Sequence, residues 1–476
     1  MLFLGNLNRT PRVHFSGIGG TGMVAGARLA VEAGWEVRGS DNPLYPPTSH
    51  MVQALGVPTY TGYVASNLDW EPDIVVIGNV LSRGNPEVEA VLERQLHYVS
   101  LPEWLKDAVL RRRRPVVVCG THGKTTTTAL TAFLLDRAGI NPGFLIGGQP
   151  VDFPHSARLG PEAAPFVIEG DEYDTAFFDK RAKFLHYLPQ IALVTSVEFD
   201  HGDIYRDLAE IERAFQLMLR QISQSGWLVL CNDDAGAVAL RDHAHCHVLT
   251  YGCGPAADFR GEHLGMDSRG QQFRILKRGH PWGEFITPLA GRHNLLNSLA
   301  ALATADLLGV GPEPLAAALR DFRGVRRRME VFLEADGVTF VDDFAHHPTA
   351  IRETVLAAKS RWPDRRLWVL FEPRSNTTVT NRFQEELIEA LRSADEVWIG
   401  PLYRAEQVPP EMRLDRSTLT KALSDQNVVA HYSDDITEIV ARVQRHTGSR
   451  DLVLILSNGA FGGIYDKLQA AFTPVR

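Results

Sequence analysis

The chain has 476 residues, 44% of them hydrophobic and 22% charged, which is typical of about three globular domains and excludes a disordered or fibrous protein. Its formal net charge of -8 gives no reason to expect nucleic acid or acidic membranes as partners, and no apolar run reaches the roughly 18 residues that span a bilayer. The four cysteines lack paired Cys-x-x-Cys spacing, which favours a reducing cytoplasm over a disulfide or zinc framework.

The first predicted element is a strand, RVHF, followed by a glycine-rich turn. The stretch before it, MLFLGNLNRTP, lacks a basic start and a long apolar core, so we expect a short leader and not a secretion signal. Gly17, Gly19 and Gly22 have the spacing G-x-G-x-x-G, and Asp41 follows about twenty residues later, after a second strand. Taken alone, this fingerprint predicts a dinucleotide site and makes an NAD-dependent dehydrogenase a serious alternative.

Short β-branched runs alternate with helical patterns along almost the whole chain. Helical spacing is clearest at 85–96 and 297–309. Strands are predicted at 12–15, 73–78, 115–120, 165–170, 191–196, 227–232, 338–344, 366–371, 396–400 and 451–457. This alternation predicts an α/β fold of parallel sheets with crossover helices.

Two arginine-rich seams divide the chain. We expect the run Arg111–Arg114 to be a solvated helix end or linker, with a phosphate-binding patch as the alternative. The second seam covers 319–332. The predicted domains are 1–112, 113–325 and 326–476.

The segment PVVVCGTHGKTTTT, from Pro115 on, reads as a strand, a turn and the start of a helix. The usual pattern G-x-x-x-x-G-K-[ST] does not fit, because Val118 stands where the first glycine should be. The physics of a phosphate loop is retained, because the N–H groups of the turn and helix start attract an anion. Lys124 can reach a terminal phosphate and Thr125 can bind Mg²⁺. We therefore predict a shortened nucleotide loop.

Polar clusters follow two later strands. FVIEGDEYD brings Glu169, Asp171, Glu172 and Asp174 to the end of one strand, and His201 follows another in VTSVEFDHGDIY. Either motif alone fits an acidic surface loop or a structural histidine. Because the carboxyl ends of parallel strands lie at one edge of a sheet, the two motifs can also converge on a metal ion.

The sequence GTHGKTTT resembles the ATP loop of the Mur ligases, and the later motifs follow in the order of that family. LAGRHNLLNSLAA resembles its nucleotide-contacting helix start, GVRRRMEVF its linker arginine, and VDDFAHHPTAI its ribose-facing aspartate. The resemblance implies a Rossmann-like N-terminal domain, a central P-loop ATPase-type domain with a parallel sheet, and a Rossmann-like C-terminal domain. It also implies a cytoplasmic, ATP-dependent and Mg²⁺-dependent ligase that forms an amide bond through an acyl phosphate.

The resemblance implies roles for individual residues. Catalytic roles fall on Lys124, Glu169, His201 and Arg328, and Mg²⁺ binding on Thr125, Glu169 and His201. ATP contacts fall on Gly120, Thr121, His122, Gly123, Lys124, Thr125, Thr126, Asn294, Arg328 and Asp343. Asn294 or Asn297 could instead cap a helix. The base that deprotonates the amine is left open among Asp343, His346 and His347, and His347 could equally cap a helix.

The N-terminal glycines also match the family, because they resemble GIGGxGM of its UDP-N-acetylmuramate ligases, and Ser40-Asp41 resembles their GSD. This implies a UDP-sugar site at Ser16, Gly17, Gly19, Gly20, Thr21, Gly22 and Asp41. A dehydrogenase would have no use for the ATP loop and the acidic cluster downstream. A P-loop switch is disfavoured by the third α/β domain.

Two branches of the family use this sugar nucleotide: one adds L-alanine in biosynthesis, and the other adds L-alanyl-γ-D-glutamyl-meso-diaminopimelate in cell-wall recycling. EGDEYDTAFFDKRAKF, LFEPRSNTTVT, NPLYPPTS and LSNGAFGGIYDKL resemble the recycling branch. A tripeptide carries several carboxylates, so Arg374 and Asn376 are predicted to bind it, with a strand-end turn and a salt bridge as the alternative. We expect these two substrates as partners, no nucleic acid, no membrane insertion, and a monomer or weak homodimer.

Overall fold

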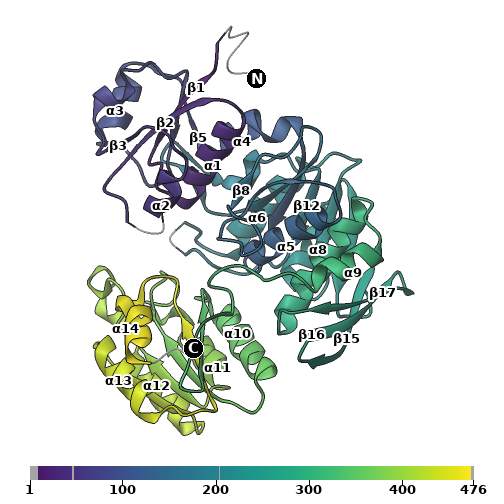
Figure 1. Ribbon diagram of the computed structural model, residues 1–476, viewed down its shortest axis with the longest axis vertical. Coiled ribbons are helices and arrows are strands. Elements are labelled where there is room, and N and C mark those ends of the chain that lie inside the picture. The colour runs from purple at the N-terminus through teal and green to yellow at the C-terminus, as the bar shows by residue number, and fades with distance from the viewer. Residues whose placement is uncertain (1–8, 46–47, 203, 473–476) are drawn as a thin grey trace.

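The structure is a computed structural model that describes residues 9–45, 48–202 and 204–472. The chain forms three α/β units arranged along its long axis, with the N-terminal and C-terminal units at opposite ends (Figure 1). The predicted leader up to residue 8, Pro46 and Pro47 of NPLYPPTS, and Asp203 lie outside the described residues. Within the described residues, no helix combines the length and apolar character that crossing a membrane requires.

The N-terminal unit is a five-stranded parallel sheet in the order β3-β2-β1-β4-β5. The order of the strands reverses between β1 and β4. Ligands of such sheets bind beside this switch point, at the carboxyl ends of the strands. The glycine turn after β1 opens there. The elements are β1 (Arg12–Ser16), α1 (Thr21–Glu32), β2 (Glu36–Asp41), α2 (Thr48–Gln53), β3 (Thr59–Thr61), β4 (Ile74–Ile77), α3 (Pro86–Glu93), β5 (Tyr98–Ser100) and α4 (Leu101–Ala108).

The central unit is a ten-stranded sheet in the order β17-β16-β15-β14-β13-β12-β6-β9-β7-β8. Seven neighbouring strands pair in parallel, in the sheet order β15-β14-β13-β12-β6-β9-β7. They are β6 (Arg114–Cys119), β7 (Gly143–Leu145), β9 (Pro165–Gly170), β12 (Ile191–Val194), β13 (Trp227–Cys231), β14 (His247–Gly252) and β15 (Phe259–Asp267). The helices are α5 (Lys124–Arg137), α6 (Leu208–Leu219), α7 (Ala235–Ala239), α8 (Arg292–Leu307) and α9 (Pro312–Leu319).

One part of the central sheet departs from the predicted parallel pattern. Strands β15, β16 (Gly270–Lys277) and β17 (His280–Thr287) form an antiparallel meander at one edge, and β8 (Ala157–Arg158) pairs antiparallel with β7 at the other. Edge strands of antiparallel sheets can leave one face in water, so they carry many polar residues and lack the continuous apolar runs that mark buried strands. The meander was therefore missed, whereas all ten predicted strands are present.

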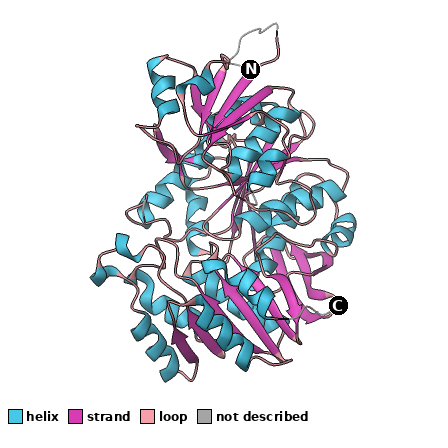
Figure 2. Cartoon of the chain, turned by 60° about the vertical axis from the view of Figure 1, so that its left-hand side comes forward, coloured by secondary structure: helices cyan, strands magenta, loops and turns pink. Residues whose placement is uncertain are grey.

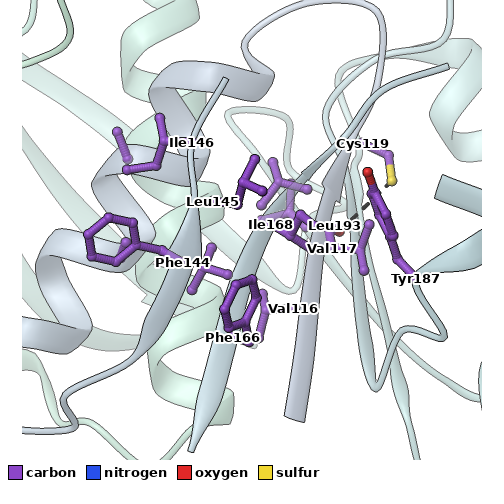
Figure 3. Packing of buried hydrophobic residues seen from close by; sticks show 14 of the residues in the cluster. Val116, Val117, Cys119, Phe144, Leu145, Ile146, Phe166, Ile168, Tyr187 and Leu193 are labelled. Atoms are coloured by element: carbon purple, nitrogen blue, oxygen red, sulfur yellow. Dashed lines mark hydrogen bonds between the residues drawn. The ribbon is translucent and has the colours of Figure 1, made fainter. Parts of the chain in front are cut away.

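The phosphate loop rests on the buried core of the central sheet. Val116, Val117 and Cys119 of β6 are 0% exposed and lie beside Ile168 of β9 and Leu193 of β12 (Figure 3). Helix α5, which continues from the loop, is buried along most of its length and packs on α8. The buried sheet therefore fixes the start of the loop, and the packed helix α5 fixes its end.

The C-terminal unit is a six-stranded sheet in the order β18-β19-β23-β20-β21-β22, with only β18 antiparallel among the described strands. Helices cover both of its faces (Figure 2). The strands are β18 (Glu330–Ala335), β19 (Val338–Asp343), β20 (Arg366–Phe371), β21 (Glu396–Ile399), β22 (Val429–Tyr432) and β23 (Asp451–Leu456). The helices are α10 (Pro348–Arg361), α11 (Gln384–Leu391), α12 (Arg416–Asp425), α13 (Ile436–His446) and α14 (Ile464–Ala471).

The arginine run at the first seam joins neighbouring parts of the chain. Arg111 pairs with Asp107 and Arg112 with Glu162, and the Arg113 guanidinium donates to the backbone oxygens at 109, 159 and 160. Arg111 and Arg112 thus form a half-exposed helix end, as predicted, whereas Arg113 is bonded to the backbone and Arg114 begins β6. The division of the chain near residues 113 and 326 stays our proposal.

Candidate active site

The shortened loop after β6 has two positions that require glycine. Gly120 has φ +125° and Gly123 has φ +79°, and a Cβ atom would clash with Thr195 at the first and with Asn297 at the second. Helix α5 begins at Lys124, and its N-cap Gly123 has no side chain to cap the first turn. The N–H groups of that turn are therefore open to an anion, as a phosphate site requires.

The Lys124 ammonium makes an ion pair with Glu172, a member of the predicted acidic cluster to which the sequence assigned no individual role. Its Nζ lies 2.8 and 2.7 Å from the two carboxylate oxygens of Glu172 and donates to Gly120 O at 2.7 Å. Burial lowers the pKa of Lys124, but the negative charges of Glu172 and Asp171 outweigh it and raise the pKa above its usual value. The lysine is thus held as a cation. The acidic stretch DEYD was the only sequence signal for Glu172.

Glu172 also contacts His201, which follows β12. The His201 Nε2 lies 3.2 Å from Glu172 Oε1 and 3.9 Å from Asp200 Oδ2. Burial lowers the pKa of His201. The hydrogen bond to Glu172 and the negative charge of Asp200 outweigh burial, so the pKa of His201 is raised above its usual value. The motifs after β6, β9 and β12 therefore meet at one edge of the sheet.

Thr125 and Glu169 form a separate oxygen pair. The Thr125 hydroxyl donates to Glu169 Oε1 at 3.0 Å, and Gly147 N–H donates to Glu169 Oε2 at 2.9 Å. Burial raises the pKa of Glu169, and the Lys124 charge opposes this. A half-buried carboxylate beside a hydroxyl matches the oxygen ligands that Mg²⁺ prefers, so these two residues fit the ion. The structure pairs the third predicted ligand, His201, with Glu172.

A cavity of about 260 Å³ lies between the central and C-terminal units. The Arg328 guanidinium lies 5.2 Å from the Phe344 ring and has no ion pair among the described residues, so its charge is available to a ligand. The predicted nucleotide residues that line the cavity are His122, Gly123, Thr126, Asn294, Arg328 and Asp343. Asn297 and Tyr251, which the sequence prediction did not assign to the site, line it as well.

The two asparagines of α8 do not cap that helix, whose N-cap is Gly291. Asn294 donates to Ala290 O at 2.8 Å, and Asn297 accepts the Thr127 hydroxyl of α5 at 3.1 Å. Asn297 therefore connects α8 to the helix of the phosphate loop. Asp343 accepts the N–H groups of residues 329 and 345, each at 2.8 Å, which fixes its carboxylate at the cavity wall.

A set of contacts, here termed the interdomain clasp, joins the third domain to the central one. Glu198 accepts the Thr349 hydroxyl at 2.8 Å and lies 3.3 Å from His122 Nε2 of the phosphate loop. Thr377 donates to Asp200 at 2.8 Å. The clasp thus comprises Glu198 and Asp200 on one side and Thr349 and Thr377 on the other, next to His122.

His347 is the N-cap of α10 and also touches the central domain. Its Nδ1 accepts the Thr349 N–H at 3.3 Å, and its Nε2 lies 3.2 Å from Phe199 O. Burial lowers the pKa of His347 to about 4, so the ring is neutral near pH 7. The helix-cap alternative is therefore confirmed for this residue.

The N-terminal glycine turn is shaped by hydrogen bonds to its own sheet. Gly17 has φ +86°, and its N–H donates to Ser40 O at 2.8 Å. Asp41 accepts the Gly19 N–H at 2.7 Å and the Tyr63 hydroxyl at 2.9 Å, so it holds the turn from the neighbouring strand. Gly20, Thr21 and Gly22 lie at the N-cap and in the first turn of α1. The Ser16 hydroxyl is buried and donates to Glu87 at 2.7 Å.

The two predicted peptide contacts lie in the loop after β20. The Arg374 guanidinium lies 3.7 Å from the Tyr403 ring centroid, and its Nη1 is 3.5 Å from Glu372 Oε1. Asn376 is exposed. Gly459, in the turn after β23, lies so close to Arg374 that a Cβ atom there would clash with it. The turns after β20 and β23 thus lie side by side.

Comparison with known proteins gives matches along almost the whole chain. Three family descriptions match: "Mur ligase family, catalytic domain" at 12–113, "Mur ligase middle domain" at 118–305 and "Mur ligase, glutamate ligase domain" at 327–459. The chain is 40% identical over 463 residues to the UDP-N-acetylmuramate–L-alanyl-gamma-D-glutamyl-meso-2,6-diaminoheptandioate ligase of Escherichia coli K12, covering 96% of this chain and 97% of that protein.

Solved structures resemble it over similar lengths. A murein peptide ligase from Psychrobacter arcticus superposes with a TM-score of 0.71 at 35% identity, covering 96% of this chain and 98% of that one. A UDP-N-acetylmuramate-alanine ligase from Thermotoga maritima gives a TM-score of 0.78 at 25% identity, covering 97% and 99%.

Proposed function

The chain belongs to the Mur ligase family, and we propose that it joins UDP-N-acetylmuramate to L-alanyl-γ-D-glutamyl-meso-diaminopimelate with ATP, as an amide-forming ligase of peptidoglycan recycling. The observation that carries this proposal is the whole-length likeness to the Escherichia coli ligase, whose name states this pair of substrates. The alternative is the ligase that adds L-alanine to the same sugar nucleotide, because the Thermotoga maritima enzyme shares the fold.

The proposed reaction has two steps. The lactyl carboxylate of the sugar nucleotide attacks the γ-phosphate of ATP, which gives an acyl phosphate and ADP. The α-amine of the tripeptide then attacks the acyl carbon, the nitrogen loses a proton, phosphate leaves, and the amide forms. Because a carboxylate and a triphosphate repel each other, the first step needs positive charge around the phosphate.

The residues of the site meet this need. We propose that Lys124 and Arg328 approach the phosphates from the loop and from the linker, and that the first turn of α5 donates N–H groups to them. Thr125 and Glu169 would hold Mg²⁺, which when bound spreads the negative charge of the phosphates. The docked third domain would keep water away from the acyl phosphate.

The choice between the two substrates is tested by phosphate release. We expect release from ATP and UDP-N-acetylmuramate when the tripeptide is supplied, and only background release when L-alanine replaces it. Mass spectrometry should find the sugar nucleotide joined to the tripeptide. Turnover with L-alanine as the preferred amine would move the protein to the biosynthetic reaction.

Replacing Arg374 by alanine should weaken recognition of the tripeptide. A charge-assisted hydrogen bond contributes about 1.5–3 kcal/mol, so we expect KM for the tripeptide to rise roughly 10- to 100-fold while KM for ATP stays the same. Steady-state kinetics with each substrate varied in turn measures both values. Arg404→Ala is the matched control, because this exposed guanidinium lies 5.1 Å from the same Tyr403 ring. Equal effects of the two substitutions would contradict the assignment.

A further inference from the structure

Glu172 is a buried carboxylate at the centre of the site with no role in the proposed reaction so far. The residue is 2% exposed, and its two oxygens lie 2.8 and 2.7 Å from Lys124 Nζ. One of these oxygens also lies 3.2 Å from His201 Nε2. The Tyr205 hydroxyl donates to the Glu172 backbone oxygen at 2.6 Å, which fixes the backbone at this position. One side chain therefore holds two predicted catalytic residues.

The contacts of Lys124 show what a nucleotide would have to displace. An ammonium group has three N–H donors. In this structure they face the two oxygens of Glu172 and the backbone oxygen of Gly120, at 2.7 to 2.8 Å. The lysine charge is thus satisfied within the protein. A terminal phosphate that contacts Lys124 must take over a donor from Glu172 or from the Gly120 oxygen, and the charged carboxylate of Glu172 holds two of the three.

We propose that Glu172 is a positioning residue that holds Lys124 and His201 in the nucleotide-free enzyme and gives up the lysine to the triphosphate when ATP binds. The inference rests on the proposed ATP-dependent function. Part of the interaction between ATP and the loop is then used to open the Lys124–Glu172 pair. Removal of the Glu172 charge should therefore increase ATP affinity and reduce turnover, because Lys124 and His201 lose the group that aligns them.

The test is a double-mutant cycle on the full-length protein with a non-hydrolysable ATP analogue and Mg²⁺, read by calorimetry. Glu172→Gln should lower Kd for the analogue by about fivefold or more, within the range of couplings between contacting residues. Lys124→Met should raise Kd. In the Lys124→Met background, Glu172→Gln should change Kd by less than about twofold, because the competing ammonium is absent.

Two further measurements separate this role from general charge or folding effects. Asp171→Asn removes a negative charge from the same loop, but Asp171 pairs with Lys183 Nζ at 2.5 Å, so Kd should stay within about twofold. Steady-state kinetics of Glu172→Gln should show kcat reduced by about tenfold or more with KM for ATP unchanged or lower. A loss that only reflected damaged folding would instead lower the fraction of the protein that binds the analogue, which the calorimetric stoichiometry reports.

Three results would overturn the inference: an unchanged Kd in Glu172→Gln, the same gain in affinity with and without Lys124, or an equal gain in Asp171→Asn. Glu172→Ala, which also removes the charge, replaces the glutamine variant in the cycle if that variant does not fold, and the same three results apply. Binding of the analogue to the unaltered protein tests the ATP-dependent function separately. An unaltered protein that fails to bind the analogue overturns that function first.

Discussion

Lys124→Ala should reduce kcat for ligation by roughly a thousandfold or more while leaving binding of UDP-N-acetylmuramate unchanged. The ammonium is the only lysine charge that the described phosphate loop carries, and it lies at the start of α5, where the N–H groups are open to an anion. Its loss removes positive charge where negative charge develops in the transition state. Phosphate release under saturating substrates measures kcat, and calorimetry with the sugar nucleotide measures the binding that should persist.

A matched control is available for this substitution. Lys183 pairs with Asp171 in the same acidic neighbourhood, so Lys183→Ala removes a nearby charge without touching the loop. We expect it to retain most of the turnover. Because Lys124→Ala leaves Glu172 buried without its cation, circular dichroism should accompany the kinetics. A folded Lys124→Ala protein with near-native turnover would refute the role assigned to the lysine.

Glu169→Gln should reduce turnover by about a hundredfold or more and raise the Mg²⁺ concentration needed for half-maximal activity. The amide keeps the size of the side chain and one acceptor for the Thr125 hydroxyl, but it removes the negative charge that a divalent ion needs. Activity against Mg²⁺ concentration measures the shift. Mn²⁺ binding followed by electron paramagnetic resonance gives a second measurement that does not depend on turnover.

Asp174→Asn is the control for the glutamate substitution. Asp174 belongs to the same sequence motif but pairs with Lys180 and accepts a hydrogen bond from Asn79 of the N-terminal unit. Asp174→Asn should leave the Mg²⁺ concentration for half-maximal activity unchanged. Identical Mg²⁺ curves for Glu169→Gln and the unaltered protein would remove Glu169 from the metal site.

The sequence was sufficient to predict the parts of the site that depend on local order. A strand, a turn and a helix follow one another around Lys124, and Glu169 lies near the end of a buried strand, so both positions could be predicted from residues close in the chain. The same holds for most of the parallel inner strands, because their apolar runs are continuous, although the inner strands β7 and β14 were not predicted. These features need no knowledge of distant contacts.

What could not be predicted depends on contacts between distant residues. The motif DEYD offers three acids after Glu169, and only the folded chain places Glu172, rather than Asp171, against the ammonium 48 positions away. Thr377 and Asp200 are 177 positions apart, and neither sequence context shows that they meet. The polar meander of β15 to β17 was missed because an edge sheet with one wet face lacks a continuous apolar run.

The interdomain clasp has a consequence for how the two half-reactions communicate. Glu198 receives a hydrogen bond from Thr349 and lies beside His122, so a single carboxylate contacts both the loop proposed to bind phosphate and the C-terminal unit proposed to bind the amine. If ligand binding at the loop changes the His122–Glu198 contact and with it the contact to Thr349, thermodynamic reciprocity requires a change at Thr349 to affect binding at the loop by the same free energy. Binding of phosphate at the loop and binding of the amine by the C-terminal unit would then be coupled through this one carboxylate.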